Sequence, residues 1–178
     1  ILDEAEEELG TRFVSAFLAH AKELSKDLVT PSQLLALYGD GGQYTRTAAS
    51  CVTAIRQITS GGILAALWEL AETLGTGFEI DMSAISLRQE TVEICEFYRL
   101  NPYQMTSAGS FLIVTKDAQE VIDILERAGV RAVRLGVTKA QNARVITSGE
   151  EVRYLDRPAP DELAVWMADR KMGITKSV

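Results

Sequence analysis

The sequence is poor in the residues that build metal centres and disulfide frameworks. In 178 residues it contains a single histidine, His20, and two cysteines, Cys51 and Cys95. The cysteines lie far apart and match no paired-ligand spacing, which argues against a zinc site. We therefore expect two free thiols in a reducing compartment. His20 falls within a helical pattern and is interpreted as a packing or helix-surface residue.

Long apolar runs and an excess of positive charge are also missing. No stretch is long enough to span a bilayer, and no signal peptide is recognisable. The net charge of −7 gives nucleic acid or an anionic membrane no basic face to hold. We therefore expect a cytoplasmic protein with no nucleic-acid or membrane partner. Its 47% hydrophobic and 24% charged residues are typical of one ordinary globular domain.

The first fifty residues predict helix and then loop. The chain begins with Ile1 and enters an acidic helical pattern at once, so we expect a fragment of a longer protein. Apolar residues at helical spacing predict a leading helix over residues 3–28, and Ser32 is expected to cap a short helix. The glycine-rich segment 39–47 is interpreted as a connector. A phosphate cradle would require a lysine or a strand-to-helix context, and this segment has neither.

Beyond residue 50, strand patterns alternate with helix patterns. Strands are predicted over residues 52–58, 77–82, 110–115 and 130–138. The continuous apolar character of 110–115 predicts a central position in a sheet. Helices are predicted from residue 63 to Gly75 or Gly77, over about 90–98, and from a cap at Asp117 to Gly129. A hairpin turning at Ser148-Gly149, a short helix and a loose tail follow. The order predicts an α+β fold in which a mixed β-sheet is layered with α-helices.

The turn between the first of these strands and its helix, Thr59-Ser60-Gly61-Gly62, is the strongest candidate for anion binding. A helix start exposes free backbone N–H groups and carries partial positive charge. Glycine lets an anion approach the backbone, and the two hydroxyls can bind a phosphate oxygen. The same features occur at helix starts that bind nothing, so a plain capped turn is the alternative.

Two other loops are weaker candidates. Ser107 and Gly109 precede the apolar strand, where a tight turn is the alternative. Lys139, Asn142 and Arg144 lie between two strands, where a solvated connection is the alternative. These segments contain no Ser/His/Asp set, nucleophile elbow or metal cluster, so no catalytic residue is assigned.

Three segments, taken in order, resemble the C-terminal domain of the aminoimidazole ribonucleotide (AIR) synthase-related superfamily. Its members include AIR synthase, selenophosphate synthetase, thiamine-monophosphate kinase and the hydrogenase-maturation dehydratase. The segments are "VTAIRQITSGGILAALWELAETLGTGFEID", "LRQETVEICEFYRLNPYQMTSAGSFLIVT" and "AGVRAVRLGVTKAQNARVI". They resemble the family's strand and Gly-Gly helix, its Asn/Asp-Pro corner and glycine loop, and its late strand. The first thirty residues resemble the leading helix of the hydrogenase-maturation branch.

The resemblance implies a longer, two-domain, homodimeric parent protein that uses ATP and Mg²⁺. Its N-terminal ATP-binding domain would be absent here, so no tightly bound cofactor or metal is expected in this chain. The implied division is a leading helix over 1–30, an α+β domain over 31–158 and a short helix and tail over 159–178. A small-molecule substrate or nucleotide would contact Gln57, Thr59, Ser60, Gly61, Gly62, Ser107 and Gly109.

Three departures from the family pattern bear on activity. Gln57 stands where the family usually has aspartate, Ala108 replaces a usual glutamate or serine, and the tail has no cysteine. Glutamine can neither ligate a metal as a carboxylate does nor act as a base. Two hypotheses follow: a domain of an ATP-dependent enzyme, or a non-catalytic binding or assembly module derived from one. A small-ligand sensor without phosphate chemistry is a third.

Overall fold

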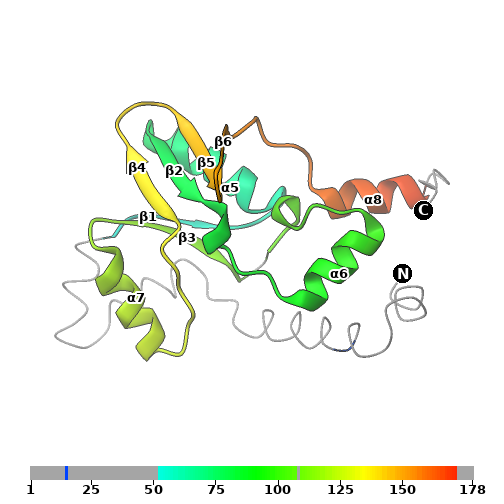
Figure 1. Ribbon diagram of the computed structural model, residues 1–178, viewed down its shortest axis with the longest axis horizontal. Helices are drawn as coiled ribbons and strands as arrows, with labels where there is room; N and C mark the ends of the chain where they lie inside the picture. Colours follow the sequence, from blue (N-terminus) through cyan, green and yellow to red (C-terminus); the bar gives the residue numbers. More distant parts are fainter. Residues whose placement is uncertain (1–14, 16–51, 108, 172–178) are drawn as a thin grey trace.

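The computed structural model describes residue 15, residues 52–107 and residues 109–171 (Figure 1). Several predictions lie outside these residues: those for the leading helix apart from Ser15, the helix at Ser32, the 39–47 loop, His20, Cys51, Ala108 and the tail. The described strands are β1 (Val52–Gln57), β2 (Gly77–Asp81), β3 (Phe111–Thr115), β4 (Gly136–Lys139), β5 (Arg144–Ser148) and β6 (Glu151–Tyr154). The helices are α5 (Gly62–Leu74), α6 (Gln89–Tyr98), α7 (Ala118–Arg127) and α8 (Glu162–Lys171), with 3₁₀ turns η1 (Met82–Ala84) and η2 (Pro102–Gln104).

The strands form two sheets. The larger one has the order β4-β2-β5-β6, in which β2 and β5 are parallel and the other pairs antiparallel. This mixed sheet with its packed helices confirms the α+β prediction. The predicted central position of residues 110–115 is wrong for the described part of the chain, where β3 pairs only with β1, antiparallel. The apolar run is explained instead by α7, whose Val121 and Leu125 pack against Ile55 and Ile113.

The strand predicted over residues 130–138 is shorter than expected. Only Gly136–Lys139 forms β4, which pairs with Gly77 to Ile80 of β2, and one further bond runs from the Asp81 N–H to the Leu135 carbonyl. Val130 and Val133 precede the strand and are exposed. Their β-branched side chains favour strand geometry locally, but no partner strand reaches them within the described residues.

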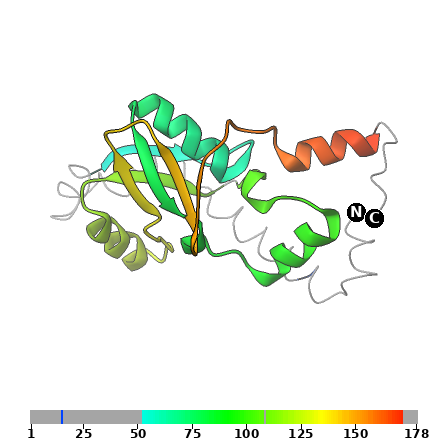
Figure 2. The same ribbon diagram turned by 45° about the horizontal axis from the view of Figure 1, so that its top comes forward.

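Helix α5 covers one face of the larger sheet (Figure 2). Its buried Leu67 and Ala71 belong to a core that includes Phe78 and Ile80 of β2 and Ile146 of β5. The helix ends at Gly75, which adopts the left-handed conformation with φ 62° and so closes the last turn, as predicted. Because this packing fixes α5 on the sheet, it also fixes the loop from which α5 begins.

Helices α6 and α8 lie beside each other at the end of the molecule away from α7 (Figures 1 and 2). The rings of Tyr98 and Trp166 meet edge to face with their centroids 5.1 Å apart. The η2 turn follows α6 and packs against the start of α5, where the partly buried Tyr103 contacts the core. The segment leading into α8 therefore comes close to the loop before α5.

Candidate functional site

The two loops that contain the predicted site residues meet at the start of α5. Gln57, the last residue of β1, pairs with Phe111, the first residue of β3. Beyond this pair the Ile58 N–H donates to the Ser110 carbonyl at 2.9 Å. The structure therefore brings all seven predicted residues together: Gln57, Thr59, Ser60, Gly61, Gly62, Ser107 and Gly109. Thr59 and Ser60 are exposed, whereas both glycines of the turn are buried.

The Gly-Gly turn requires glycine for two physical reasons. Gly61 and Gly62 have φ values of 81° and 69°, which side-chain-bearing residues rarely adopt. A Cβ at Gly62 would also meet the Tyr103 carbonyl and lie 2.8 Å from the Met105 nitrogen. The turn therefore brings the start of α5 into backbone contact with the segment after α6.

A residue that the sequence analysis missed, Asp161, ties the two loops together. Its Oδ2 accepts from the Gly61 N–H at 3.0 Å and from the Thr106 N–H at 2.8 Å. Its Oδ1 accepts from the Ala164 N–H at 3.2 Å, which caps the first turn of α8. The side chain is almost completely buried. An aspartate after Pro158-Ala159-Pro160 signals a helix cap, but nothing local indicates a bond to Gly61.

The hydroxyl groups of the second loop form a short bridge of their own. The Oγ atoms of Ser107 and Ser110 lie 2.9 Å apart, within hydrogen-bond distance. The Ser110 N–H also donates to the Ser107 carbonyl at 3.1 Å, and Gly109 has φ 86° between them. This tight turn leaves the Ser107 side chain partly buried, whereas Thr59 and Ser60 on the other loop are exposed.

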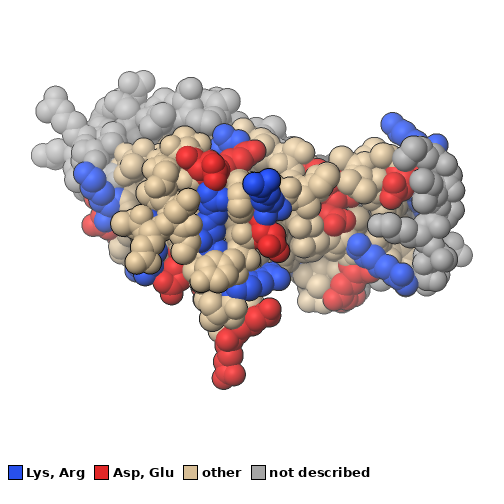
Figure 3. All heavy atoms as spheres, turned by 90° about the horizontal axis from the view of Figure 1, so that it is seen from above, with Lys and Arg blue, Asp and Glu red and all other residues tan. Residues whose placement is uncertain are grey.

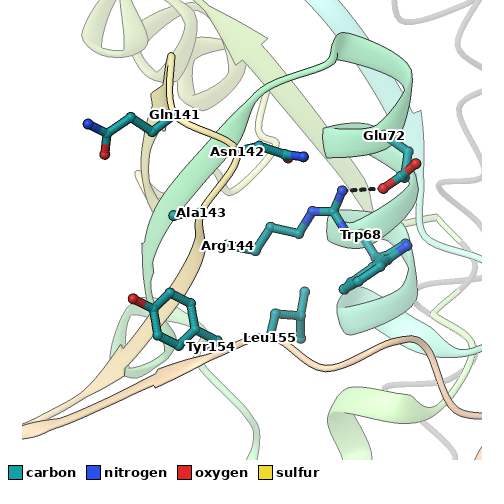
Figure 4. A pocket seen from close by; sticks show the side chains of 8 residues that line it. All are labelled: Trp68, Glu72, Gln141, Asn142, Ala143, Arg144, Tyr154 and Leu155. Carbon is teal, nitrogen blue, oxygen red and sulfur yellow. Dashed lines mark hydrogen bonds and ion pairs between the residues drawn. The ribbon is translucent and has the colours of Figure 1, made fainter.

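The third candidate loop belongs to a separate part of the surface. Lys139 forms an ion pair with Glu79 at 3.0 Å. Arg144 is buried rather than solvated, pairs with Glu72 and stacks on Trp68 with its guanidinium carbon 3.8 Å from the ring centroid (Figure 4). Arg144, Glu72, Trp68 and Asn142 line an open pocket of about 580 Å³ near the C-terminal end of α5, and Lys139 is not part of its lining. The pocket therefore lies at the opposite end of α5 from the Gly-Gly turn.

Cys95 packs under the same loops as an inert thiol. Its Sγ lies 3.8 Å from the Met105 Sδ, and burial raises the pKa of the thiol from 9.0 to about 11. Between about pH 9 and pH 11 the unfolded chain therefore releases this proton while the folded chain keeps it. The contribution of the group to stability is fully present below pH 9 and is lost as the pH rises through this window.

We therefore expect Cys95→Ala to flatten the fall in the free energy of unfolding between pH 9 and pH 11. Urea unfolding of the wild type and the variant across this range measures the difference in slope. The variant also loses packing contacts, but this loss lowers the free energy of unfolding equally at every pH. It therefore does not contribute to the difference in slope. Identical slopes in the two proteins would contradict the raised pKa of the thiol.

The described part of the chain contains neither a cluster of metal-binding side chains nor a helix suited to crossing a membrane. Residues 52–107 and 109–171 contain no group of three or more His, Cys, Asp or Glu side chains that could hold a metal ion. Gln57, which stands where the family pattern usually has an aspartate, carries an amide instead of a carboxylate. Among the same residues, no helix combines the length and the apolar character that crossing a membrane requires. On the face shown in Figure 3, basic side chains lie beside acidic ones.

The geometry defines a class of protein: a mixed α/β domain in which a turn with two exposed hydroxyls, those of Thr59 and Ser60, precedes one helix. Residues 43–148 match the model of the protein family described as "AIR synthase related protein, C-terminal domain". The chain belongs to this family, as its resemblance implied.

The relatives of the chain are hydrogenase maturation proteins. It is 36% identical over 123 residues to the carbamoyl dehydratase HypE of Rhodobacter capsulatus, covering 65% of this chain and 36% of that protein. It is 28% identical over 117 residues to a putative hydrogenase expression/formation protein of Methanocaldococcus jannaschii, covering 63% and 35% of the two proteins. The chain thus spans about a third of the length of these curated relatives.

Solved structures share the fold. The crystal structure of Escherichia coli HypE superposes with a TM-score of 0.59 at 25% identity, covering 67% of this chain and 40% of that one. HypE in complex with ATP gives a TM-score of 0.56 at 20% identity, covering 62% and 37%. The second comparison is evidence for the fold alone.

Proposed function

We propose that this chain is the C-terminal domain of an ATP-dependent hydrogenase-maturation-like protein, in which it closes a phosphate or substrate cleft against an N-terminal domain. One observation carries the proposal: seven residues from two loops far apart in the sequence meet at the start of α5. Membership of the family and the relatives named HypE support it, and the fold is shared with a HypE structure in complex with ATP.

Within the cleft, the hydroxyls are the groups we expect to touch the ligand. Thr59 and Ser60 are exposed, and Ser107 on the second loop is partly buried. Gly61 and Gly62 shape the turn and allow its backbone to approach the backbone of the segment after α6. No acidic cluster is available among the described residues to hold Mg²⁺, so the ligands for that ion would come from elsewhere in the parent protein.

The remaining features of the parent follow from the same proposal. Residues 31–158 would form the body of the domain, preceded by the leading helix over 1–30. Residues 159–178 would form a C-terminal segment that joins the body through Asp161. We further propose a cytoplasmic homodimer without nucleic-acid or membrane partners.

The proposal is tested in the parent protein with its N-terminal domain present. We expect ATP with Mg²⁺ to raise the melting temperature and to be turned over. If ATP neither binds nor shifts the melting temperature, the proposal is overturned. Binding without turnover favours the alternative, a non-catalytic binding or assembly module. Gln57 in the place of the family's aspartate supports this alternative, because an amide can supply neither a base nor a strong metal ligand.

A second prediction concerns the two hydroxyls in the present chain. We expect the double variant Thr59→Ala/Ser60→Ala to weaken the response to inorganic phosphate about tenfold or more, because a hydrogen bond to a charged group contributes about 1.5–3 kcal/mol. Amide chemical shifts of residues 59 and 60 measure the response at millimolar phosphate. Both side chains are exposed, so the free energy of unfolding is expected to change by less than about 0.5 kcal/mol.

Ser148→Ala is the matched control, since Ser148 is an exposed serine on the β5–β6 hairpin of the other sheet. It removes a hydroxyl without touching either loop. An equal loss of response in this control would show that phosphate binds non-specifically.

A further inference from the structure

The start of α5 already has an anion of its own. The Gly61 N–H and the Thr106 N–H, which come from the two loops of the candidate site, converge on the same oxygen of Asp161 at 3.0 and 2.8 Å. The other oxygen accepts from Ala164 at 3.2 Å. Three backbone donors from three segments therefore satisfy one buried carboxylate, as a buried charge requires.

We propose that Asp161 is the built-in anion of the candidate site. Its carboxylate takes the place at the start of α5 that an external anion would take, and it positions the two loops relative to each other. The cleft then selects its ligand through the exposed hydroxyls rather than through attraction of negative charge. This last consequence rests on the proposed function; the positioning role does not.

The electrostatics at the helix start support this assignment. The unpaired N–H groups there carry partial positive charge that favours an anion. The carboxylate of Asp161 meets this preference internally, and the Gly62 N–H donates to the Thr59 carbonyl at 3.0 Å. An external phosphate that approached Gly61 would therefore find its amide already bonded and a buried negative charge beside it.

The path of the chain before α8 supports the assignment independently. A Cβ placed on Gly61 would lie 3.4 Å from the Ala159 carbonyl oxygen. The segment from Ala159 to Asp161 thus runs directly over the turn. It covers the Gly61 amide while Thr59 and Ser60, on the same turn, remain exposed. The carboxylate and the hydroxyls accordingly face different surroundings.

The test removes the carboxylate and supplies an anion from solution. Asp161→Ala in the full 178-residue chain is compared with the wild type, using sodium formate and inorganic phosphate as probes and chloride to hold the ionic strength constant. We expect the Gly61 and Thr106 amides of the variant to exchange with solvent at least tenfold faster than in the wild type. Formate or phosphate should then shift both amides saturably and restore their protection. In the wild type, whose two amides are already bonded to Asp161, neither anion should raise their protection further.

Two further variants keep the test decisive. Asp156→Ala removes an exposed carboxylate from the same segment and is expected to leave both amides unchanged. Should Asp161→Ala fail to fold, Asp161→Asn keeps one acceptor oxygen and is expected to show faster exchange at Gly61 and Thr106 or at Ala164. Saturable binding of phosphate at the wild-type Gly61 amide would overturn the proposal. So would a folded Asp161→Ala chain that responds to neither anion.

The outcome separates this proposal from the proposed function. The role of Asp161 is measured at the amides of Gly61 and Thr106, whereas the proposed function is measured at residues 59 and 60 and by ATP binding to the parent. Rescue of Asp161→Ala by formate in a protein whose parent ignores ATP would support the role of Asp161 and reject the ATP-dependent function. Turnover of ATP by the parent, together with a lack of rescue of Asp161→Ala by formate, would support the ATP-dependent function and reject the role of Asp161.

Discussion

Gly62→Ala is expected to lower the free energy of unfolding by about 2–6 kcal/mol. A side-chain-bearing residue in the left-handed conformation costs about 1–3 kcal/mol, and forcing atoms into a packed site costs about 1–3 kcal/mol more. Both penalties apply at Gly62, which has φ 69° and whose added Cβ would collide with the Tyr103 carbonyl and with Met105. Because the obstructing atoms are backbone, they cannot move aside as a flexible side chain would.

Gly75→Ala is the matched control for this prediction. Gly75 has a similar φ of 62° and lies at the other end of the same helix, yet no contact within 4 Å of its Cβ position is made by the described part of the chain. The control therefore carries the conformational penalty alone, about 1–2 kcal/mol. Urea unfolding of both variants measures the difference. Equal destabilisation would mean that the contact between the turn and the segment after α6 is unimportant for stability.

Arg144→Ala is expected to lower the free energy of unfolding by about 2–4 kcal/mol. The side chain fills space against Trp68, so its removal leaves a gap in the packing as well as ending a cation–π contact. The partner carboxylate of Glu72 is 59% exposed and is readily solvated once the guanidinium is gone. Most of the loss should therefore come from packing rather than from charge.

Two comparisons check this division between packing and charge. Arg56 of β1 pairs with Glu69, which lies on α5 as Glu72 does. The side chains of Arg56 and Glu69 are 41% and 48% exposed, so Arg56→Ala should lower the free energy of unfolding by no more than about 1 kcal/mol. Arg144→Met keeps most of the volume and removes the buried Nε, which has no hydrogen-bond partner among the residues that the structure describes. We expect it to cost less than half as much as Arg144→Ala. A methionine variant as unstable as the alanine variant would show that the ion pair dominates.

The elements that could be predicted from sequence are those with local signals at their ends. Gly75 ends α5 in the left-handed conformation, the Asp117 side chain accepts from the Glu120 N–H at the start of α7, and Gly149 lies in the turn of the β5–β6 hairpin with φ 60°. Each signal acts within a few residues of its partner. Their bounds could therefore be predicted from short segments alone.

The errors concern partners rather than elements. An apolar strand such as β3 has the same sequence pattern whether strands flank it on both sides or helices cover its faces. The length of β4 was overestimated because it depends on how much of β2 is available for pairing. Periodicity describes which side chains are buried, but not which element buries them.

The candidate site divides in the same way. The sequence and its family resemblance were sufficient to select the residues of the two loops, which the structure brings together. Arg144 was placed in a loop, either as a weak binding candidate or as part of a solvated connection, although it occupies a buried position of β5 beside α5. Asp161 could not have been selected, because its role depends on donors at Gly61 and Thr106, up to 100 residues away.

The span of the bond between Gly61 and Asp161 has a consequence for synthesis of the protein. A ribosome that adds about 5–20 residues per second needs about 5–20 s to make the 100 residues between them. During this interval the Gly-Gly turn exists on the nascent chain without its carboxylate, and β2 also waits for its parallel partner β5. A chain halted before residue 161 would leave this helix start open to solvent anions, so a stalled or prematurely terminated product should differ from the finished domain in its anion binding.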